Sequence, residues 1–288
     1  MERVRLIVNG DDFGISEEVN HGIVRAFREG VLTSCSLMVG GAAFEHAVRL
    51  AAKNEGLAVG LHVVTVQGRS VLPHQEIPSI VDGERNFSND PVTAGIKYYF
   101  SRKARCEIEK ELAAQFEKFA STGLDLSHID SHLHMHVHPV VFGCLLRLGA
   151  EYGARRMRVP EDDLRMSLIF ERRQWLKQTA ERAVFKVLCR SMRKKLRVAG
   201  FVFADRVHGH FMSGRMSEDY FIHVLDHLGG GANEVYFHPA AYEEGVSLDP
   251  HERQCLREFN ILVSTKVKEK LHRPSIKLTT YKGLQANR

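Results

Sequence analysis

Five side chains able to bind a metal or move protons alternate along residues 126–139, LSHIDSHLHMHVHP; they are Asp130, His132, His134, His136 and His138. In an extended strand, residues two apart lie on the same face, so the spacing predicts one polar row. A solvated edge strand or a hydrogen-bonded core would explain a single histidine. Because unpartnered imidazoles and carboxylates are costly to bury, so dense a row favours a metal or acid–base site.

Other reactive side chains stand at the carboxyl ends of short apolar runs: Asp11 and Asp12, His62, His132, Arg158, and His238. In a closed or nearly closed βα barrel these ends face the same side, where active sites form from several strands. An open doubly wound sheet would spread them along a line. The convergence therefore favours an α/β fold of the distorted seven-stranded (β/α) barrel type.

Strand-like and helical runs alternate along most of the chain. The predicted strands are 4–9, 32–39, 56–64, the histidine row, 155–160, 201–205 and 234–237, and the first ends in a turn that carries Asp11 and Asp12. Helical patterns cover 16–28, the stretch before residue 53, 102–121, 140–152, 251–259 and 266–271. This pattern predicts a single domain over 1–288, with a long loop insertion at 65–100 and a basic helical insertion at 165–199.

The reactive residues match the needs of metal-assisted hydrolysis. One Asp oxygen and two His nitrogens leave room for water or substrate on a catalytic metal. An adjacent carboxylate can take the proton of a water, and a separate histidine can protonate the leaving group. Together, Asp11, Asp12, His62, His132 and His238 fill these roles and indicate hydrolysis of an amide or ester. A metal-dependent phosphoesterase and a non-catalytic lipid- or sugar-binding protein are the alternatives.

The composition is that of an ordinary globular protein, with 44% hydrophobic and 26% charged residues among 288. The N-terminus does not resemble a secretion signal, and no apolar run approaches the ~20 residues that span a bilayer. We therefore expect a cytoplasmic protein, or one attached peripherally to the inner face of the membrane. The five cysteines form no CxxC pair, which favours reduced thiols over disulfides or a zinc finger.

At the same residues the sequence resembles a known family. Four short stretches are similar to motifs of the YdjC-like carbohydrate deacetylases, also called the chitooligosaccharide deacetylase family. They are NGDDFG near the start, GLH at 60–62, DSHLHMH at 130–136 and FHPA at 237–240. The stretches LTSCSLMVGG, VLPHQEIPSIVDG and AGIKYYF resemble the HpnK-like branch associated with hopanoid biosynthesis.

This resemblance implies a barrel related to polysaccharide deacetylases and removal of an N-acetyl group from an amino sugar. It implies that Asp12, His62 and His132 bind a divalent cation, Mg²⁺ or Zn²⁺, with Asp11 as the general base and His238 as the general acid. In the HpnK-like branch the implied substrate is an N-acetylglucosaminyl hopanoid lipid. Soluble chitooligosaccharides are the alternative substrate.

Three further polar residues are candidates for substrate contacts. Arg158 could contact sugar hydroxyls or the acetyl oxygen. Asp130 shares the predicted face of His132 and could be its hydrogen-bond partner. His136 could lie behind the metal site and orient a ligand, or have a structural role.

Residues 171–200 carry ten Lys or Arg against two Glu, interleaved with apolar side chains. This pattern is typical of a solvated helix packed on the outside of the barrel, or of an interfacial helix on an anionic membrane surface. Nucleic acid is not an expected partner, because an aromatic platform or groove-reading motif is missing. The oligomeric state, a homodimer included, is left open.

Overall fold

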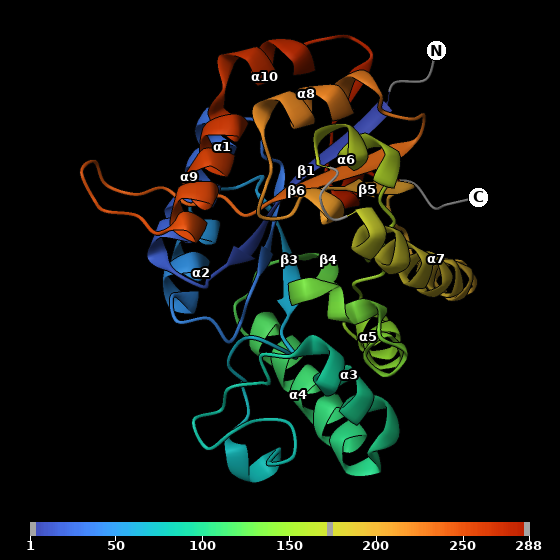
Figure 1. The fold of residues 1–288 in the computed structure, drawn as a ribbon. Coiled ribbons are helices and arrows are strands. Elements are labelled where there is room, and N and C mark those ends of the chain that lie inside the picture. Colours follow the sequence, from blue (N-terminus) through green and yellow to red (C-terminus); the bar gives the residue numbers. More distant parts are fainter. Residues whose placement is uncertain (1–3, 172–174, 285–288) are drawn as a thin grey trace.

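The computed structural model describes residues 4–171 and 175–284 and has a parallel sheet at its centre (Figure 1). The strand order is β4-β3-β2-β1-β6-β5, and β7 also pairs with β1. The strands are β1 (Val4–Phe13), β2 (Ser34–Leu37), β3 (Ala58–Val63), β4 (Leu126–Ser131), β5 (Arg206–His208), β6 (Ala232–Phe237) and β7 (Ile276–Leu278). The strands β2, β3 and β6 are buried along their whole length, as expected of a parallel sheet covered on both faces.

Two isolated bridges continue the sheet beyond β4. Ile129 pairs in parallel with Met157, and Arg156 pairs in parallel with Val202. The Met157 amide also donates to the Val202 carbonyl over 3.1 Å. The sheet therefore curls so that segments following β4 approach β5. This curled parallel sheet confirms the predicted distorted barrel class.

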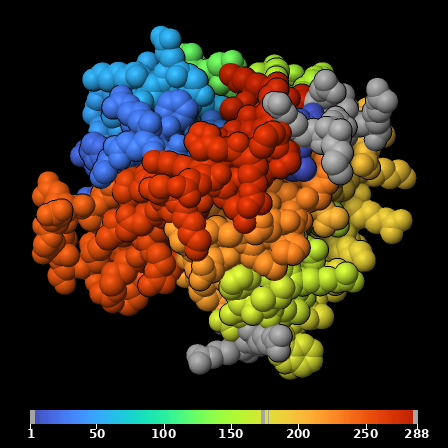
Figure 2. Space-filling model, turned by 90° about the horizontal axis from the view of Figure 1, so that it is seen from above, coloured from blue at the N-terminus to red at the C-terminus, as the bar shows by residue number. Residues whose placement is uncertain are grey.

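Helices surround the sheet: α1 (Glu17–Glu29), α2 (Phe44–Ala52), α3 (Pro91–Phe100), α4 (Arg102–Ala120), α5 (Pro139–Glu151), α6 (Leu164–Phe170), α7 (Trp175–Val198), α8 (Glu218–Asp226), α9 (Pro250–Val263) and α10 (Thr265–Leu271). In Figure 1, α1, α2 and α9 lie on one side, and α5 and α7 lie on the other. Figure 2 views the end that carries α8 and α10, where the red C-terminal segments lie beside the blue N-terminal ones.

Local sequence explains several helix limits. Ser16 accepts a hydrogen bond from the Val19 amide and caps α1, whose first residues are acidic, and Gly30 follows its last residue. In α4, the apolar residues Ile108, Leu112 and Phe116 recur at helical spacing and are fully buried. These boundaries follow from the helical period and from capping, without tertiary information.

Other predicted boundaries were wrong. The strand β1 continues through Phe13 instead of ending at residue 9. Residues 201–205 contribute only an isolated bridge, and the strand is Arg206–His208. The short strand β7 lies beyond the last predicted helix, where no strand was predicted. Within the predicted loop 65–100, the last ten residues form α3, and the earlier part is held by the bridges Arg69–Asn86 and Val81–Phe87.

Over the described parts of the chain, no helix combines the length and the apolar character needed to cross a membrane. All five cysteines lie in the described ranges as free thiols. The thiol prediction is therefore consistent with this structure.

Candidate active site

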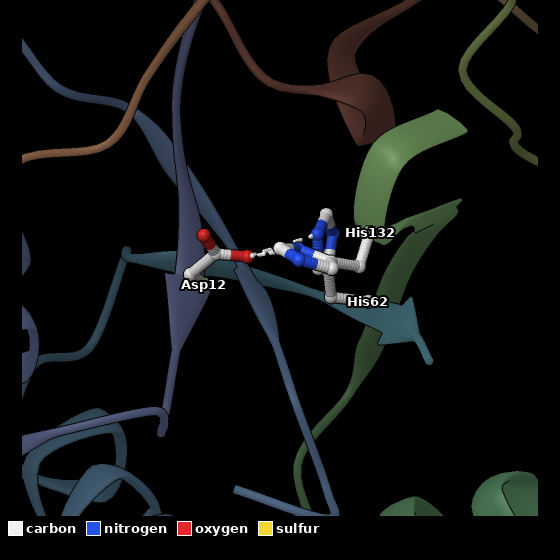
Figure 3. Close-up of side chains that lie close together, drawn as sticks. All are labelled: Asp12, His62 and His132. Carbon is white, nitrogen blue, oxygen red and sulfur yellow. Dashed lines mark hydrogen bonds and ion pairs between the residues drawn. The ribbon is translucent and has the colours of Figure 1, made fainter. Parts of the chain in front are cut away.

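Three side chains from separate strand ends meet around one carboxylate oxygen (Figure 3). His132 Nδ1 lies 3.0 Å from Asp12 Oδ1, and His62 Nε2 lies 3.2 Å from the same atom. Asp12 belongs to β1, His62 to β3, and His132 directly follows β4. Their candidate ligand atoms all lie within 4.8 Å of one another. The structure thus brings together the three residues named as metal ligands, which are separated in sequence.

An irregularity in β1 lets both neighbouring aspartates reach the site. Adjacent residues of a regular strand point to opposite faces. Here the pairing with β2 shifts register between Gly10 and Phe13, and Asp12 has a positive φ of 65°. Asp12 consequently turns toward His62 and His132, whereas Asp11 lies beside Arg158 on the same cavity. Such a left-handed backbone is costly for a non-glycine residue and is found preferentially at functional sites.

Asp130 orients His62 from behind. The His62 Nδ1 donates to Asp130 Oδ1 over 2.8 Å, which turns Nε2 toward Asp12. Burial disfavours the imidazolium form, yet the surrounding carboxylates, Asp130 foremost, raise the pKa of His62 to about 10. Because Asp130 bonds to His62, and His132 bonds to Asp12, the prediction that Asp130 pairs with His132 was wrong. Asp130 is also fully buried and does not line the cavity, and its contact with a substrate stays a prediction.

Arg158 lies at the centre of a buried ionic network. Its Nη1 and Nη2 donate to the two Asp11 oxygens over 2.7 and 2.8 Å, and Nη1 also lies 3.0 Å from Asp130 Oδ2. The Nε and Nη2 donate to Glu234 Oε1 over 2.9 and 2.7 Å. Burial opposes its charge, but these carboxylates hold the pKa of Arg158 well above its usual value. Arg158 is fully buried and does not line the cavity, and its contact with a substrate stays a prediction.

The predicted single row of histidines does not form. The strand β4 ends at Ser131, and residues 132–137 form a short 3₁₀ segment in which Leu133 and His134 have positive φ. His136 therefore turns away from the cavity and bonds to the Ser131 hydroxyl through Nδ1 at 2.6 Å. A substrate contact of His136 stays a prediction. His134 and His138 do line the cavity.

His238 is fixed at the carboxyl end of β6. Its amide donates to Glu258 Oε2 over 2.6 Å, and its Nδ1 lies 3.8 Å from the same oxygen. The imidazole is partly exposed and lines the cavity together with Asp11 and His62. The predicted general acid therefore borders the same space as the predicted base.

Sequence analysis missed the polar residues that support these groups. Asn9 donates to Asp11 over 2.7 Å, and Ser36 donates to Asp130 over 2.8 Å. Tyr281, near the C-terminus, donates to the Glu234 carboxylate behind Arg158. The one available signal was that Asn9 and Ser36 interrupt otherwise apolar strands, since buried polar groups need partners. Nothing in the sequence links Tyr281 to the site.

The donor set and the local charge suit a divalent cation. Asp11 and Asp130 share the guanidinium of Arg158, and Asp12 adds a third carboxylate beside His62 and His132, so the site is rich in negative charge. Burial acts to raise the pKa of Asp12, but the two imidazoles hold it well below its usual range and keep it ionised. Catalytic metal sites typically combine such a set of one carboxylate and two imidazole ligands with a further carboxylate that hydrogen-bonds to one of the imidazoles. The proton on His62 Nε2 would be replaced by the cation on binding.

A cavity of about 720 Å³ opens over this cluster. Its polar end contains Asp11, His62, His132, Tyr236 and His238. Its outer part is lined by residues of α3 and α7, two helices that lie on either side of α5 in Figure 1. That part is lined by apolar side chains: Val92, Ile96, Tyr99 and Phe100 from α3, Leu133, and Phe185 and Leu188 from α7.

A family model described as YdjC-like protein matches residues 5–273. The chain belongs to the YdjC-like family. A carbohydrate deacetylase of Brevibacillus brevis is 36% identical over 283 residues, covering 98% of this chain and 100% of the relative. A carbohydrate deacetylase of Geobacillus stearothermophilus is 33% identical, with 96% of each chain covered. A chitooligosaccharide deacetylase of Salmonella typhi is 30% identical, covering 95% of this chain and 98% of the relative.

A solved structure supports the YdjC-like fold. A crystal structure from Enterococcus faecalis V583, provisionally described as a cellobiose-phosphate cleavage protein, superposes with a TM-score of 0.73. The two chains are 25% identical, and 98% of each is covered. The family model and the carbohydrate deacetylase relatives confirm the family prediction, whereas the HpnK-like branch stays a prediction.

Proposed function

We propose that this YdjC-like protein is a metal-dependent deacetylase that hydrolyses the N-acetyl group of an N-acetylglucosaminyl substrate. The observation that carries this proposal is the meeting of Asp12, His62 and His132 at one oxygen, with Asp11 and His238 on the same cavity. The carbohydrate deacetylases among its relatives, aligned over nearly the whole chain, support the substrate class.

Each residue then has a defined task. A divalent cation on Asp12, His62 and His132 would polarise the acetyl carbonyl and acidify a nearby water. Asp11 accepts the proton of the attacking water as the new C–O bond forms, and Arg158 and Asn9 hold its carboxylate in place. His238 donates a proton to the nitrogen as the C–N bond breaks, which releases acetate and the free amine. Glu258 fixes the His238 backbone amide, and its carboxylate lies 3.8 Å from the imidazole Nδ1.

The outer cavity supports a lipid-linked substrate, with an N-acetylglucosaminyl hopanoid as the specific proposal. Ile96 and Phe100 on α3 remain 57% and 75% exposed although they line the cavity. A soluble oligosaccharide would leave exposed aliphatic side chains such as Ile96 in contact with water, whereas an apolar aglycone would cover them. Residues of the HpnK-like stretch AGIKYYF belong to this wall.

Acetate release tests the proposed function. Purified protein should release acetate from an N-acetylglucosaminyl hopanoid, and more slowly from chitooligosaccharides, and release should stop with a chelator. A phosphate-release assay on sugar phosphates tests the phosphoesterase alternative. Phosphate release without acetate release would contradict the proposal. If the protein released neither acetate nor phosphate, a binding protein would be favoured.

The outer face of α7 supports peripheral attachment to an anionic membrane. Leu176, Val184 and Val187 form an exposed apolar stripe, 65%, 58% and 70% exposed. Beside it run the exposed cations Arg182, Lys186, Arg190 and Lys194 at four-residue spacing. A helix with adjoining apolar and basic stripes binds the interface of anionic bilayers.

Vesicle flotation tests this attachment. Vesicles containing anionic lipid should bind the protein at low salt, and Val187→Asp should weaken binding. Val246→Asp, which changes a similarly exposed valine in the loop before α9, is the matched control. Equal binding by both variants, or no binding to any vesicle, would contradict the attachment.

A further inference from the structure

A continuous row of rings leads from His238 along the cavity wall to α7. The ring centroids of neighbours lie 5.7 Å apart for His238 and Tyr236, 5.2 Å for Tyr236 and His134, and 5.1 Å for His134 and His210. The ring of Phe185 lies 4.5 Å from that of His210 and ends the row. All five side chains line the cavity. The row therefore starts at the candidate general acid and ends on α7, and none of its members belongs to the Asp12, His62 and His132 cluster.

His134 in this row is held in place yet has an unused polar atom. It is only 6% exposed, and its Nε2 lies 3.0 Å from the Tyr236 hydroxyl. Its Nδ1 is buried and has no hydrogen-bond partner within the described chain. Its φ of 54° is a strained backbone for a histidine. A buried polar atom without a partner is costly, so a ligand hydroxyl reaching Nδ1 would relieve that cost.

Glu181 lies at the far end of the row. Its Oε1 is 3.2 Å from His210 Nε2, and both side chains line the cavity. A carboxylate and imidazoles can accept or donate hydrogen bonds to sugar hydroxyls, and the Phe185 ring beside them offers an apolar face for the C–H groups of a sugar ring. These groups lie on the cavity wall but are not part of the metal cluster.

We propose that His134, His210 and Glu181 bind hydroxyl groups of the sugar whose acetamide reaches Asp12, and so make the site selective for carbohydrate over other acetyl compounds. This inference rests on the proposed deacetylase function. The three residues are positioning residues, because they act on the sugar and not on the acetyl group. None of them was identified as a substrate-binding residue from the sequence.

A pair of substrates separates sugar recognition from chemistry. One is an N-acetylglucosaminyl conjugate, and the other is p-nitrophenyl acetate, which has an acetyl group but no sugar hydroxyls. Glu181→Gln and His210→Gln should each lower the ratio of kcat/KM for the sugar over the ester by roughly tenfold or more, mainly through KM. Glu151→Gln, an exposed position on α5, is the matched control and should leave the ratio unchanged. An unchanged ratio in both cavity variants would overturn the inference.

Equilibrium binding gives a readout independent of turnover. Saturation-transfer NMR with N-acetylglucosamine should show contact in the wild type and a weaker signal in Glu181→Gln and His134→Gln. If His134→Gln misfolds by circular dichroism, the Glu181 and His210 variants still decide the outcome. Sugar binding that depends on Glu181, without acetate release, would sink the deacetylase proposal and keep the subsite. Acetate release with unaltered sugar binding in every variant would support the deacetylase proposal and contradict the proposed sugar-binding role of these residues.

Discussion

The two ends of the cavity are built in different ways. At the metal end, Asp11, His62 and Asp130 are buried, and each is bonded to at least one other polar side chain. At the outer end, Ile96 and Phe100 on α3 are largely exposed. The first group comes from strands of the sheet, and the second from a helix outside it.

This difference indicates how the two tasks are divided. A catalytic group needs a fixed position, and parallel strands supported by buried hydrogen bonds provide it. Substrate choice depends on surrounding segments, which can vary without disturbing the sheet. We therefore expect changes at the metal end to affect every substrate, and changes at the outer end to affect substrates selectively.

Removing an imidazole ligand should have the largest effect. His132→Ala deprives the cation of one nitrogen, so both metal content and acetate release should fall. The loss of activity should exceed the roughly 10²–10⁴-fold contribution of a general acid or base. Metal analysis of protein purified without chelators, together with acetate release, checks this. Full metal content and turnover in this variant would show that the cation lies elsewhere.

Asp11→Asn should separate chemistry from metal binding. The amide keeps the shape of the side chain but cannot accept the proton of water, so turnover should fall about 10²–10⁴-fold. Metal content should stay at the wild-type level, because Asp12, His62 and His132 are unchanged. Near-normal turnover would assign the base to another residue, and a melting curve controls for the altered contact with Arg158.

Asp130→Asn should have an intermediate effect. The change weakens the hydrogen bond that orients His62, and loss of such a partner typically lowers metal affinity about 10–100-fold. Titration with Zn²⁺ against a chromophoric chelator measures the affinity. An unaltered affinity would mean that His62 keeps its orientation without the Asp130 charge.

A change at the outer end should have the smallest and most selective effect. The double variant Ile96→Ser and Phe100→Ser should raise KM for a lipid-linked N-acetylglucosaminyl substrate by roughly tenfold or more, because each lost apolar contact weakens aglycone binding. KM for a chitooligosaccharide should change little. Val246→Ser provides a matched surface control. An equal effect on both substrates would remove the distinction between the two ends.

The sequence predicted the parts of the fold that depend on local pattern. Apolar runs such as VRLIVN and GLAVGLHVV became β1 and β3, and Asp12, His62 and His132 stand at or just beyond strand ends as expected. Parallel strands bring their carboxyl ends to one edge, so the meeting of these residues could be inferred without a structure. The family motifs led to the same residues.

The prediction that side chains two residues apart share one face was wrong beyond Ser131. Leu133 and His134 adopt left-handed backbone angles, which break the alternation and send His136 into the protein. Whether a non-glycine residue bears such strain depends on contacts supplied by distant segments, here including the Tyr236 hydroxyl for His134. A local pattern carries no information about those contacts.

The amino-acid sequence by itself determined which side chains could do chemistry and that strand ends would gather them. Only the tertiary structure decided that Arg158 pairs with Asp11, that Asp130 supports His62, and that α3 and α7 line the outer cavity. The physical reason is that the partner of a buried charge is chosen by packing between segments far apart in the chain, which neither residue type nor spacing specifies.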